Sequence, residues 1–427
     1  MGELTKQRIP VMTHTERTRL AFLTSTHVVD DLYQGAVPAL LPFLAIERHY
    51  SYAGLTGITL AATFLASVVQ PGFGALTDKY RNLGWLVAAG LLVAGLGIGL
   101  CGLGDSYLIT WCAVAASGIG VAAYHPEATR TARGLAGDST QAMSWFSVGG
   151  NAGIALGPII VTPILLATRL HGTPLLALPA VAMAAVLAVR RPWRQARQQQ
   201  SKRTRAAAGQ GDDWRGFARL TVVVVLRSVA YFGVASLLAL YAIRHFHAPA
   251  AVGSTVLTVF IGAGVIGTLG GGWLADRWQR VGVLRLGYGL AAVAAALLAT
   301  APDVAVLFTA AFFLGIVLFA PFAVQVTLGQ DFLPNRIGIA SGVTLGLATS
   351  AGGLAAPLFG LLADSRGLTV ALCAVAVFPA IACALTFLLG DPRVAAAAAG
   401  SLASDATRIG ETPSGRTLAR GDGARVG

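Results

Sequence analysis

The sequence has few charged residues for its length. Of its 427 residues, 12% are Asp, Glu, Lys or Arg, whereas a soluble domain has about 25%. Hydrophobic residues make up 55% of the chain, and its 52 glycines fit membrane helices, in which glycine allows close packing. This composition excludes a soluble globular protein and predicts an all-α polytopic membrane protein.

Cysteine is also scarce, and no pattern of enzyme chemistry accompanies it. All four cysteines fall inside apolar stretches, at Cys101, Cys112, Cys373 and Cys383, so they predict neither a disulfide framework nor a metal site. No nucleophile or metal-ligand pattern lies at a predicted membrane surface, and we expect no enzyme activity, cofactor or bound metal. The first 19 residues are polar and lead into no cleavable signal peptide.

Twelve apolar stretches are each long enough to be a membrane-crossing helix, which needs about 20 residues. The predicted spans are residues 20–46, 54–76, 84–104, 107–129, 142–166, 174–190, 218–242, 251–275, 284–301, 305–328, 339–363 and 369–390. Short hydrophilic connectors separate neighbouring spans. The sequence therefore predicts twelve transmembrane helices.

One long connector divides these spans into two halves. Residues 191–217 are rich in Arg, Gln, Ala and Gly and are interpreted as an exposed cytoplasmic linker. The expected domains are six-helix bundles over 20–190 and 218–390. Residues 1–19 form an N-terminal segment, and 391–427 have the composition of a disordered tail.

The basic residues predict the orientation in the membrane. If both termini are cytoplasmic, the external loops hold only Arg48, Arg169, Arg244 and Arg366, and Arg227 lies within a span. The other 26 of the 31 Lys and Arg residues lie in cytoplasmic segments or at the cytoplasmic ends of spans. This asymmetry is the positive-inside pattern, and it accounts for the net charge of +12 without nucleic acid as a partner.

The first span contains an unusual polar stripe. On a helix, His27, Asp31 and Gln34 fall at i, i+4 and i+7, with Asp30 beside them. Charge in a span costs at least about 2.5–3.5 kcal/mol per Asp. We therefore expect these residues to face a wet cavity or a partner inside the bundle. The alternative is a polar packing cluster satisfied by neighbouring helices.

The two halves repeat each other at an offset of 198 residues. Tyr33 and Gly35 in the first span match Tyr231 and Gly233 in the seventh. The loop from Gly74 through Asp78 to Lys79 matches the loop from Gly272 through Asp276 to Arg277. Such registered copies predict parallel six-span halves related by an axis along the membrane normal.

These features resemble the major facilitator superfamily. The two loops are similar to the signature that the family carries between spans 2 and 3, from which they depart at Arg81, Asn82 and Gln279. The resemblance implies two pseudo-symmetric helical bundles with substrate between them near the midplane. It also implies that the loops latch the halves in the outward-open state. Their aspartates then bind a helix N-terminus or an arginine on an adjacent span, for which Arg130 is the candidate.

A closer resemblance is to the fosmidomycin-resistance branch of that family, which implies drug efflux. The residues that carry it are His27, Asp30, Asp31, Tyr33 to Pro42, Tyr124 to Ala128, Arg130, Gly149 to Gly153, Leu156 to Pro158, Leu226 to Ser228, Tyr231 to Gly233, Leu333, Arg336, Gly338, Ser341, Gly342, Gly352 and Gly353. They follow one another through spans 1 to 11 and so cover nearly the whole membrane portion.

A proton-driven carrier needs buried groups that gain and lose a proton. The carboxyl candidates are Asp30, Asp31 and Glu127, and burial favours the protonated form of such groups. His27 and His125 are candidate relays, because imidazole is the side chain that titrates near neutral pH. Alternatively, Arg130 neutralises Glu127 in a local pair at i, i+3.

Arg227 is the basic residue at the middle of a span, and it is the candidate substrate ligand. Its counterpart by the offset is Val29, beside Asp30. Arg can hold a phosphonate or carboxylate with two parallel hydrogen bonds. The alternative is a structural pair with Asp30 or Asp31. The other candidate substrate-binding residues are Gln34, Tyr33, Asn151, Tyr231 and Gln325.

The sequence thus predicts a secondary transporter in the bacterial plasma membrane, a monomer with both termini cytoplasmic. We expect it to export small drugs or anionic metabolites, such as fosmidomycin-like phosphonates, in exchange for protons. A proton symporter that imports a metabolite is the alternative, because its sequence would look nearly identical. A membrane sensor is disfavoured, because no folded soluble domain is visible in the sequence.

Overall fold

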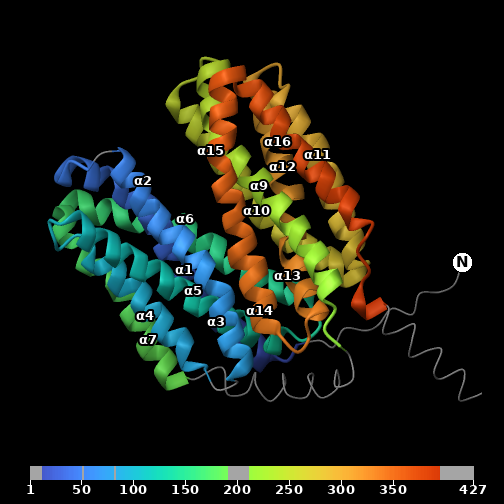
Figure 1. Ribbon diagram of the computed structural model, residues 1–427, viewed down its shortest axis with the longest axis horizontal. Helices are drawn as coiled ribbons and strands as arrows, with labels where there is room; N and C mark the ends of the chain where they lie inside the picture. The colour runs from blue at the N-terminus through green and yellow to red at the C-terminus, as the bar shows by residue number, and fades with distance from the viewer. Residues whose placement is uncertain (1–11, 51, 81–82, 191–210, 395–427) are drawn as a thin grey trace, which may run out of the picture.

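The computed structural model describes residues 12–50, 52–80, 83–190 and 211–394. Within these ranges the chain is helical throughout and forms no β-strand. The helices gather into two halves that diverge from one end of the molecule, the first half in blue and green and the second in yellow to red (Figure 1).

Nine elements make up the first half in chain order. They are α1 (His14–Arg48), α2 (Tyr52–Leu60), η1 (Ala61–Leu65), α3 (Ala66–Lys79), α4 (Trp85–Leu100), α5 (Tyr107–Ala136), α6 (Thr140–Thr168), η2 (Arg169–Ala177) and α7 (Leu178–Arg190). The element η1 is a π-helical turn inside the second span, and η2 is a 3₁₀ helix.

The second half contains the remaining elements. They are α9 (Trp214–His245), α10 (Ala250–Arg277), α11 (Arg280–Ala299), α12 (Val304–Phe319), α13 (Pro321–Phe332), α14 (Ile337–Ser341), η3 (Gly342–Leu347), α15 (Ala348–Arg366) and α16 (Leu368–Thr386). Here η3 is a second π-helical segment. Each half buries its own hydrophobic core.

The predicted spans coincide with these helices. Among the described residues, nine continuous helical stretches are long and apolar enough to cross a bilayer, and one of them, Thr140–Arg190, covers two predicted spans. The helix α4 is apolar but has only 16 residues, and α1 holds the polar stripe of the first predicted span. The all-α polytopic fold in two halves is confirmed.

Several predicted boundaries are wrong by a few residues. The linker was expected to end at 217, but α9 begins at Trp214, because Asp213 caps its N-terminus by accepting from the Gly216 amide. The tail was expected from Asp391, yet residues 392–394 are helical and Asp391 pairs with Arg280. The rest of the expected tail, 395–427, and residues 191–210 of the linker lie outside the described part of the chain.

Two further boundaries follow from local sequence. The helix α1 begins at His14 rather than 20, because Thr13 and Glu16 form a capping box. The sixth span was expected to be helical from 174, but its start belongs to the 3₁₀ segment η2, which contains Pro174. The α-helical part follows as α7.

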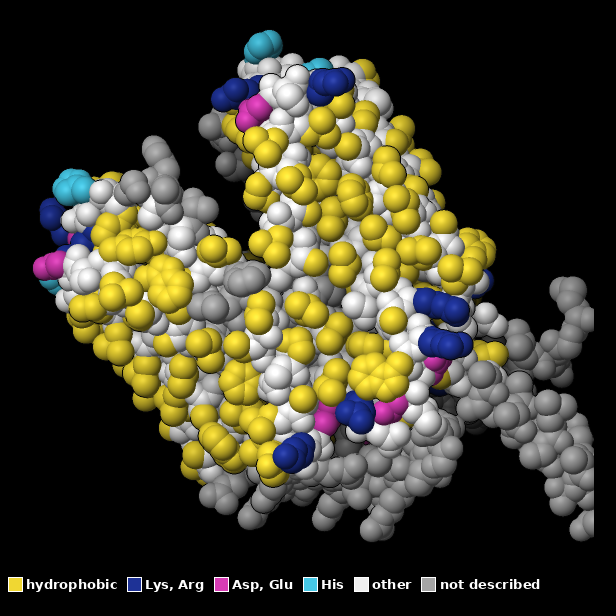
Figure 2. Space-filling model, viewed as in Figure 1, with side chains coloured by type: hydrophobic (Ala, Val, Ile, Leu, Met, Phe, Trp, Pro, Cys, Tyr) yellow, Lys and Arg dark blue, Asp and Glu magenta, His cyan; other side chains and the backbone are white. Residues whose placement is uncertain are grey.

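The two halves meet at one end and separate toward the other. The helix α6 packs against α10, and α3 packs against α14 and η3. Gly74 and Gly338 lie at the second of these crossings, where a Cβ on either glycine would collide with the backbone of the other helix. Figure 2 shows the opposite end hollowed into a cleft between the halves. We call these the closed end and the open end.

Within the first half, α1 and α6 cross with their backbones nearly in contact. A Cβ on Gly35 would meet the backbone of Ile154, and one on Gly153 would meet the backbone of Val28. Glycine permits this approach because it has no side chain. The crossing brings the backbone of α6 up to the polar stripe of α1.

Candidate functional site

The polar stripe of α1 forms a cluster with His125 of α5, near the middle of both helices. His27 and Asp31 are each 5% exposed and His125 is 7% exposed. His27 Nε2 lies 3.3 Å from an Asp31 carboxylate oxygen, and His125 Nε2 lies 3.4 Å from the other. The two Nε2 atoms are 3.4 Å apart. Three predicted coupling residues thus form one buried group.

Backbone carbonyls fix the orientation of both imidazole rings. His27 Nδ1 lies 2.8 Å from the carbonyl of Phe146 on α6, and His125 Nδ1 lies 2.8 Å from the carbonyl of Val121. A carbonyl can only accept a hydrogen bond, so each Nδ1 carries a proton and each Nε2 faces Asp31. Gln34 donates to the Asp31 carboxylate at 2.6 Å from the next turn.

Asp30 lies beside this cluster in a different environment. Its side chain is fully buried, and neither carboxylate oxygen has a hydrogen-bond partner among the described residues. His125 Nδ1 lies 3.5 Å from one of its carboxylate oxygens. A buried charge without hydrogen bonds is costly, so Asp30 is the carboxyl of α1 that its surroundings compensate least.

Glu127 belongs to a separate group closer to the closed end. Its carboxylate lies 3.6 Å from Arg130, at the i, i+3 spacing of the local pair considered above. Arg130 also donates to the Asp78 carboxylate and to the Thr77 carbonyl. The geometry therefore matches the local-pair alternative for Glu127 and links this residue to the closed end.

Arg227 lies in the core of the second half, on α9, and is 6% exposed. Its guanidinium stacks over Phe319 at 5.4 Å and Phe322 at 4.8 Å from the ring centroids. Within the described chain it forms no ion pair, and its Nε has no hydrogen-bond partner. The alternative pairing with Asp30 or Asp31 is therefore wrong for this conformation.

Other predicted substrate residues also carry unused donors. Gln325 is fully buried, and its carbonyl oxygen accepts from the Tyr288 hydroxyl at 2.7 Å, but its amide nitrogen has no partner in the described structure. The same holds for the amide nitrogen of Asn151 on α6. Tyr231, one turn after Arg227, stacks against Phe260 and meets Phe319 edge to face.

Tyr33 has a structural role instead of the predicted one. Its hydroxyl donates to the Leu176 carbonyl and accepts from the Ala180 amide, each at 3.0 Å. These bonds fasten α1 to the break between η2 and α7. Because its single hydroxyl hydrogen is donated to Leu176 and the side chain is only 1% exposed, we remove Tyr33 from the substrate-binding residues.

The two signature segments, predicted as loops, are helical and form the C-terminal ends of α3 and α10, where they make equivalent contacts at the closed end. Asp78 accepts from the amides of Gly338 and Ile339, at the start of α14, at 2.9 Å each. Asp276 accepts from the amides of Thr140 and Gln141, at the start of α6, at 2.6 and 3.1 Å. An aspartate at a helix N-terminus satisfies free amides and the helix dipole.

The contacts of Asp78 and Asp276 differ in their additional partners. Asp78 additionally binds Arg130, whereas Asp276 additionally accepts from the Ser139 hydroxyl at 2.7 Å. Gly272 of α10 lies against the Ser144 side chain of α6, at the crossing of these two helices. Lys79 and Arg277 stack over the neighbouring rings of Tyr80 and Trp273.

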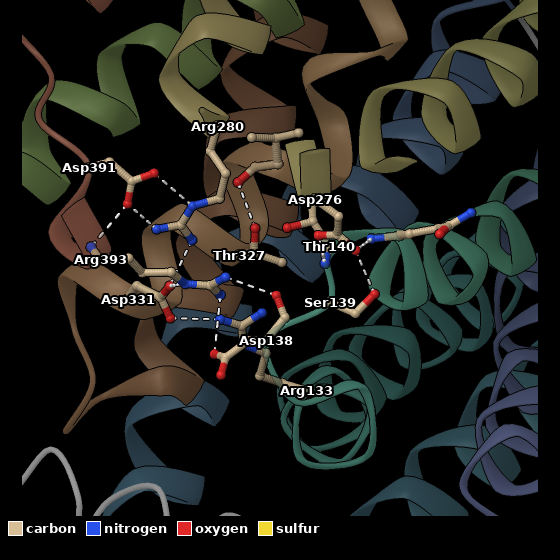
Figure 3. Close-up of polar contacts among 12 residues, drawn as sticks. Arg133, Asp138, Ser139, Thr140, Asp276, Arg280, Thr327, Asp331, Asp391 and Arg393 are labelled. Atoms are coloured by element: carbon tan, nitrogen blue, oxygen red, sulfur yellow. Dashed lines mark hydrogen bonds and ion pairs between the residues drawn. The ribbon is translucent and has the colours of Figure 1, made fainter. Parts of the chain in front are cut away.

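A third contact between the halves, at the closed end, was not predicted from the sequence (Figure 3). Arg133 on α5 pairs with Asp331 on α13 at 2.7 Å. Asp331 also pairs with Arg280 and Arg393, at 2.7 Å each. The members of this axial network are Arg133, Asp138, Arg280, Asp331, Asp391 and Arg393. The 198-residue offset, which makes Arg133 and Asp331 counterparts, was the signal available.

Comparison with known proteins agrees with this architecture. The model of a family described as the Major Facilitator Superfamily matches residues 23–357. The uncharacterized MFS-type transporter YfnC of Bacillus subtilis is 30% identical over 85% of this chain and 90% of its own. The fosmidomycin resistance protein of Escherichia coli is 28% identical over 88% of this chain and 93% of its own.

Solved structures show the same fold at low sequence identity. FucP, a fucose:proton symporter of E. coli solved in the outward conformation, has a TM-score of 0.69 at 16% identity, covering 86% of this chain and 98% of its own. The human organic anion transporter MFSD10 has a TM-score of 0.68 at 14% identity, covering 88% of this chain and 100% of its own. With the family match over residues 23–357, these findings show that the chain belongs to the Major Facilitator Superfamily and is a transporter, not an enzyme.

Proposed function

We propose that this transporter exports small anionic compounds, of the phosphonate or carboxylate class, in exchange for protons. The observation that carries the substrate class is Arg227, a buried cation with an unpartnered Nε and no carboxylate partner among the described residues. A buried charge needs a partner. An anionic ligand would supply it, and the planar guanidinium suits such groups.

The surroundings of Arg227 support a ligand rather than a structural counter-ion. The unpartnered amide nitrogen of Gln325 is another buried donor of the second half, and Tyr231 and Tyr288 are the electrostatic neighbours of Arg227. Phe319 and Phe322 supply apolar surface beside the charge. A small compound with one anionic group and an apolar part suits this set. The name of the fosmidomycin resistance protein points in the same direction.

The proton side of the exchange is assigned to the first half. There Asp30, Asp31, His27 and His125 are all buried. Val29, the counterpart of Arg227 at the offset of 198, is the neighbour of Asp30. Gln325 of the second half is the counterpart of Glu127, again at the offset of 198. The first half thus holds buried carboxylates and the second half a buried arginine, at equivalent depth. This division suits exchange of a proton for an anion.

The orientation proposed from the positive-inside pattern places the closed end in the cytoplasm. The open end then faces outward, and the described conformation is outward-open. The same assignment puts both termini on the cytoplasmic side of a bacterial plasma membrane, in a multi-pass monomer.

The test is transport of a labelled phosphonate into inverted membrane vesicles, with and without an imposed proton gradient. Export in exchange for protons predicts uptake that depends on an acidic vesicle interior and stops when an uncoupler collapses the gradient. Uptake that ignores the gradient would contradict the coupling. Vesicles prepared without the transporter serve as the control for leak.

Import by proton symport is the second candidate, because FucP and the xylose transporter XylE are named as proton symporters. Symport predicts accumulation in right-side-out vesicles driven by an acidic exterior. Accumulation there, with none in inverted vesicles, would overturn the export proposal.

A further inference from the structure

The three polar groups that converge between α1 and α5 have the spacing of ligands around a metal ion. His27 Nε2 lies 3.3 Å from Asp31 Oδ2, His125 Nε2 lies 3.4 Å from Asp31 Oδ1, and the two Nε2 atoms are 3.4 Å apart, so the carboxylate faces them with both oxygens. Tetrahedral Zn²⁺ with bonds of about 2.0–2.2 Å separates its ligand atoms by about 3.3–3.6 Å. Charge-assisted hydrogen bonds between the same groups would be about 2.7–2.9 Å long.

The surrounding contacts hold these groups as metal ligands are usually held. Each imidazole commits Nδ1–H to a carbonyl, of Phe146 or of Val121, which directs the Nε2 lone pair at the common centre. Gln34 donates to Asp31, so the carboxylate is also oriented by a hydrogen bond. Such outer contacts fix ligand geometry and raise affinity for the ion.

Without a cation, this arrangement is unfavourable. Two imidazole nitrogens that each present a lone pair would face one another and a carboxylate in a buried space. Either protons on both Nε2 atoms or one metal ion removes that repulsion. Two imidazoles and a carboxylate are borderline ligands that suit Zn²⁺ and its neighbours in the first transition series.

We propose that a divalent transition-metal ion of the Zn²⁺ class binds between His27 Nε2, His125 Nε2 and the Asp31 carboxylate. The ion is a competitor of protons for these atoms rather than a resident cofactor. The sequence alone predicted no metal site, because the cysteine spacing and the surface motifs give no sign of one. The two histidines lie 98 residues apart in the chain, on different helices.

The direct test is metal binding by the purified, metal-stripped wild-type protein, prepared with an affinity tag that contains no histidine. We expect one Zn²⁺ per chain by equilibrium dialysis, and visible absorption bands of tetrahedral Co²⁺ when Co²⁺ replaces Zn²⁺. His27→Gln and His125→Gln should each weaken binding more than about tenfold. The matched control is His247→Gln, which changes an exposed histidine at the open end and should leave binding unchanged.

A further variant keeps the test valid if the histidine variants fail to fold. Gln34→Ala removes the hydrogen bond to Asp31 from an exposed position, so the protein should fold while Zn²⁺ binds about tenfold more weakly. Absence of Zn²⁺ binding by monodisperse wild-type protein would overturn the proposal. So would loss of binding in His247→Gln with retention in His27→Gln.

Binding should also inhibit transport, a consequence that rests on the proposed function. Because the ion occupies the atoms assigned to protons, Zn²⁺ should slow gradient-driven transport by the wild type and affect Gln34→Ala, which keeps those atoms, less at equal Zn²⁺. Binding without inhibition would argue against the coupling role of the cluster and leave the metal site standing. The two failures are therefore distinguishable.

Discussion

Arg133 and Asp331 lie 198 residues apart, at equivalent positions of the two halves, and pair with each other at 2.7 Å. Residues that are exchanged by a pseudo-two-fold axis can meet only where that axis passes. The pair therefore marks the axis at the closed end. Because Asp331 also binds Arg280 and Arg393, one carboxylate holds three guanidinium groups there.

Loss of that carboxylate should open the closed end. Asp331→Asn leaves three arginines facing one another, whereas Arg133→Gln leaves Asp331 paired with the other two. Removing one member of a buried pair costs about 3–5 kcal/mol, so we expect Asp331→Asn to increase the inward-open population more than Arg133→Gln does. Distances between spin labels at Tyr80 and Trp278, both exposed, measure this. Identical distance distributions for wild type and Asp331→Asn would contradict it.

Exchanging the two charges separates a simple pair from the network. If Arg133 and Asp331 mattered only to each other, the variant Arg133→Asp with Asp331→Arg would behave like wild type. The structure predicts the reverse, because an arginine at 331 would face Arg280 and Arg393. We expect the double variant to transport more slowly than Arg133→Gln alone. Recovery of wild-type turnover would show that the additional arginines contribute nothing.

The two latches should affect turnover more than affinity. Asp78→Asn and Asp276→Asn each remove a charge that caps a helix of the other half, away from the proposed substrate residues. We expect kcat to fall several-fold with KM changed less than about threefold, since only conformational exchange is affected. Asp78→Asn should be the more severe because Asp78 also binds Arg130. The control is Asp303→Asn, which changes the residue that caps α12 within one half.

The coupling proposal makes a prediction about the carboxylates of α1. Asp31→Asn should abolish gradient-driven transport and leave substrate exchange partly intact, because exchange needs no net proton movement. Asp30→Asn is the informative comparison, since Asp30 has no hydrogen-bond partner to lose among the described residues. Normal gradient-driven transport by Asp31→Asn, with loss in Asp30→Asn, would move the coupling role to Asp30.

Arg227 decides the charge of the substrate. Arg227→Lys should reduce transport of a phosphonate at least about tenfold, because an ammonium cannot reproduce the planar fork of the guanidinium. A neutral compound, if carried, should be affected less. Uptake of one phosphonate and one neutral compound by the same vesicles makes the comparison. An equal loss for both would end the anion-site proposal.

The sequence was sufficient for the fold and for the latch aspartates because both are local or repeated signals. Apolar runs of membrane length predict spans whatever they pack against, and the 198-residue repeat by itself relates Asp78 to Asp276. The polar stripe of His27, Asp31 and Gln34 was equally visible. Its assembly with His125 was not, since nothing in the spacing of α1 says which helix crosses it.

The incorrect and missing predictions have the same cause. Tyr33 was assigned to the substrate from its place in the first span, but its hydroxyl is bound by the backbone at Leu176 and Ala180, a contact between distant segments. Arg133 and Asp331 each resemble an ordinary charge at a helix end. Only the packing of α5 against the second half turns them into partners, and the repeat offset alone does not say which counterparts lie on the axis.

The latches also bear on how these proteins diverge. Asp78 and Asp276 are received by backbone amides, which every residue except proline provides. The amide contact itself therefore requires no particular side chain at the receiving position, and here the counterparts are Thr140 in one half and Gly338 in the other. Gly338 is restricted by its close approach to Gly74 and not by its contact with Asp78. Selection can act on the aspartates alone while their receptors vary. In such a contact only the aspartate can be recognised from the sequence, because its partner is a backbone amide. Comparisons between distant relatives will therefore find the signature segment but not the helix N-terminus that it binds.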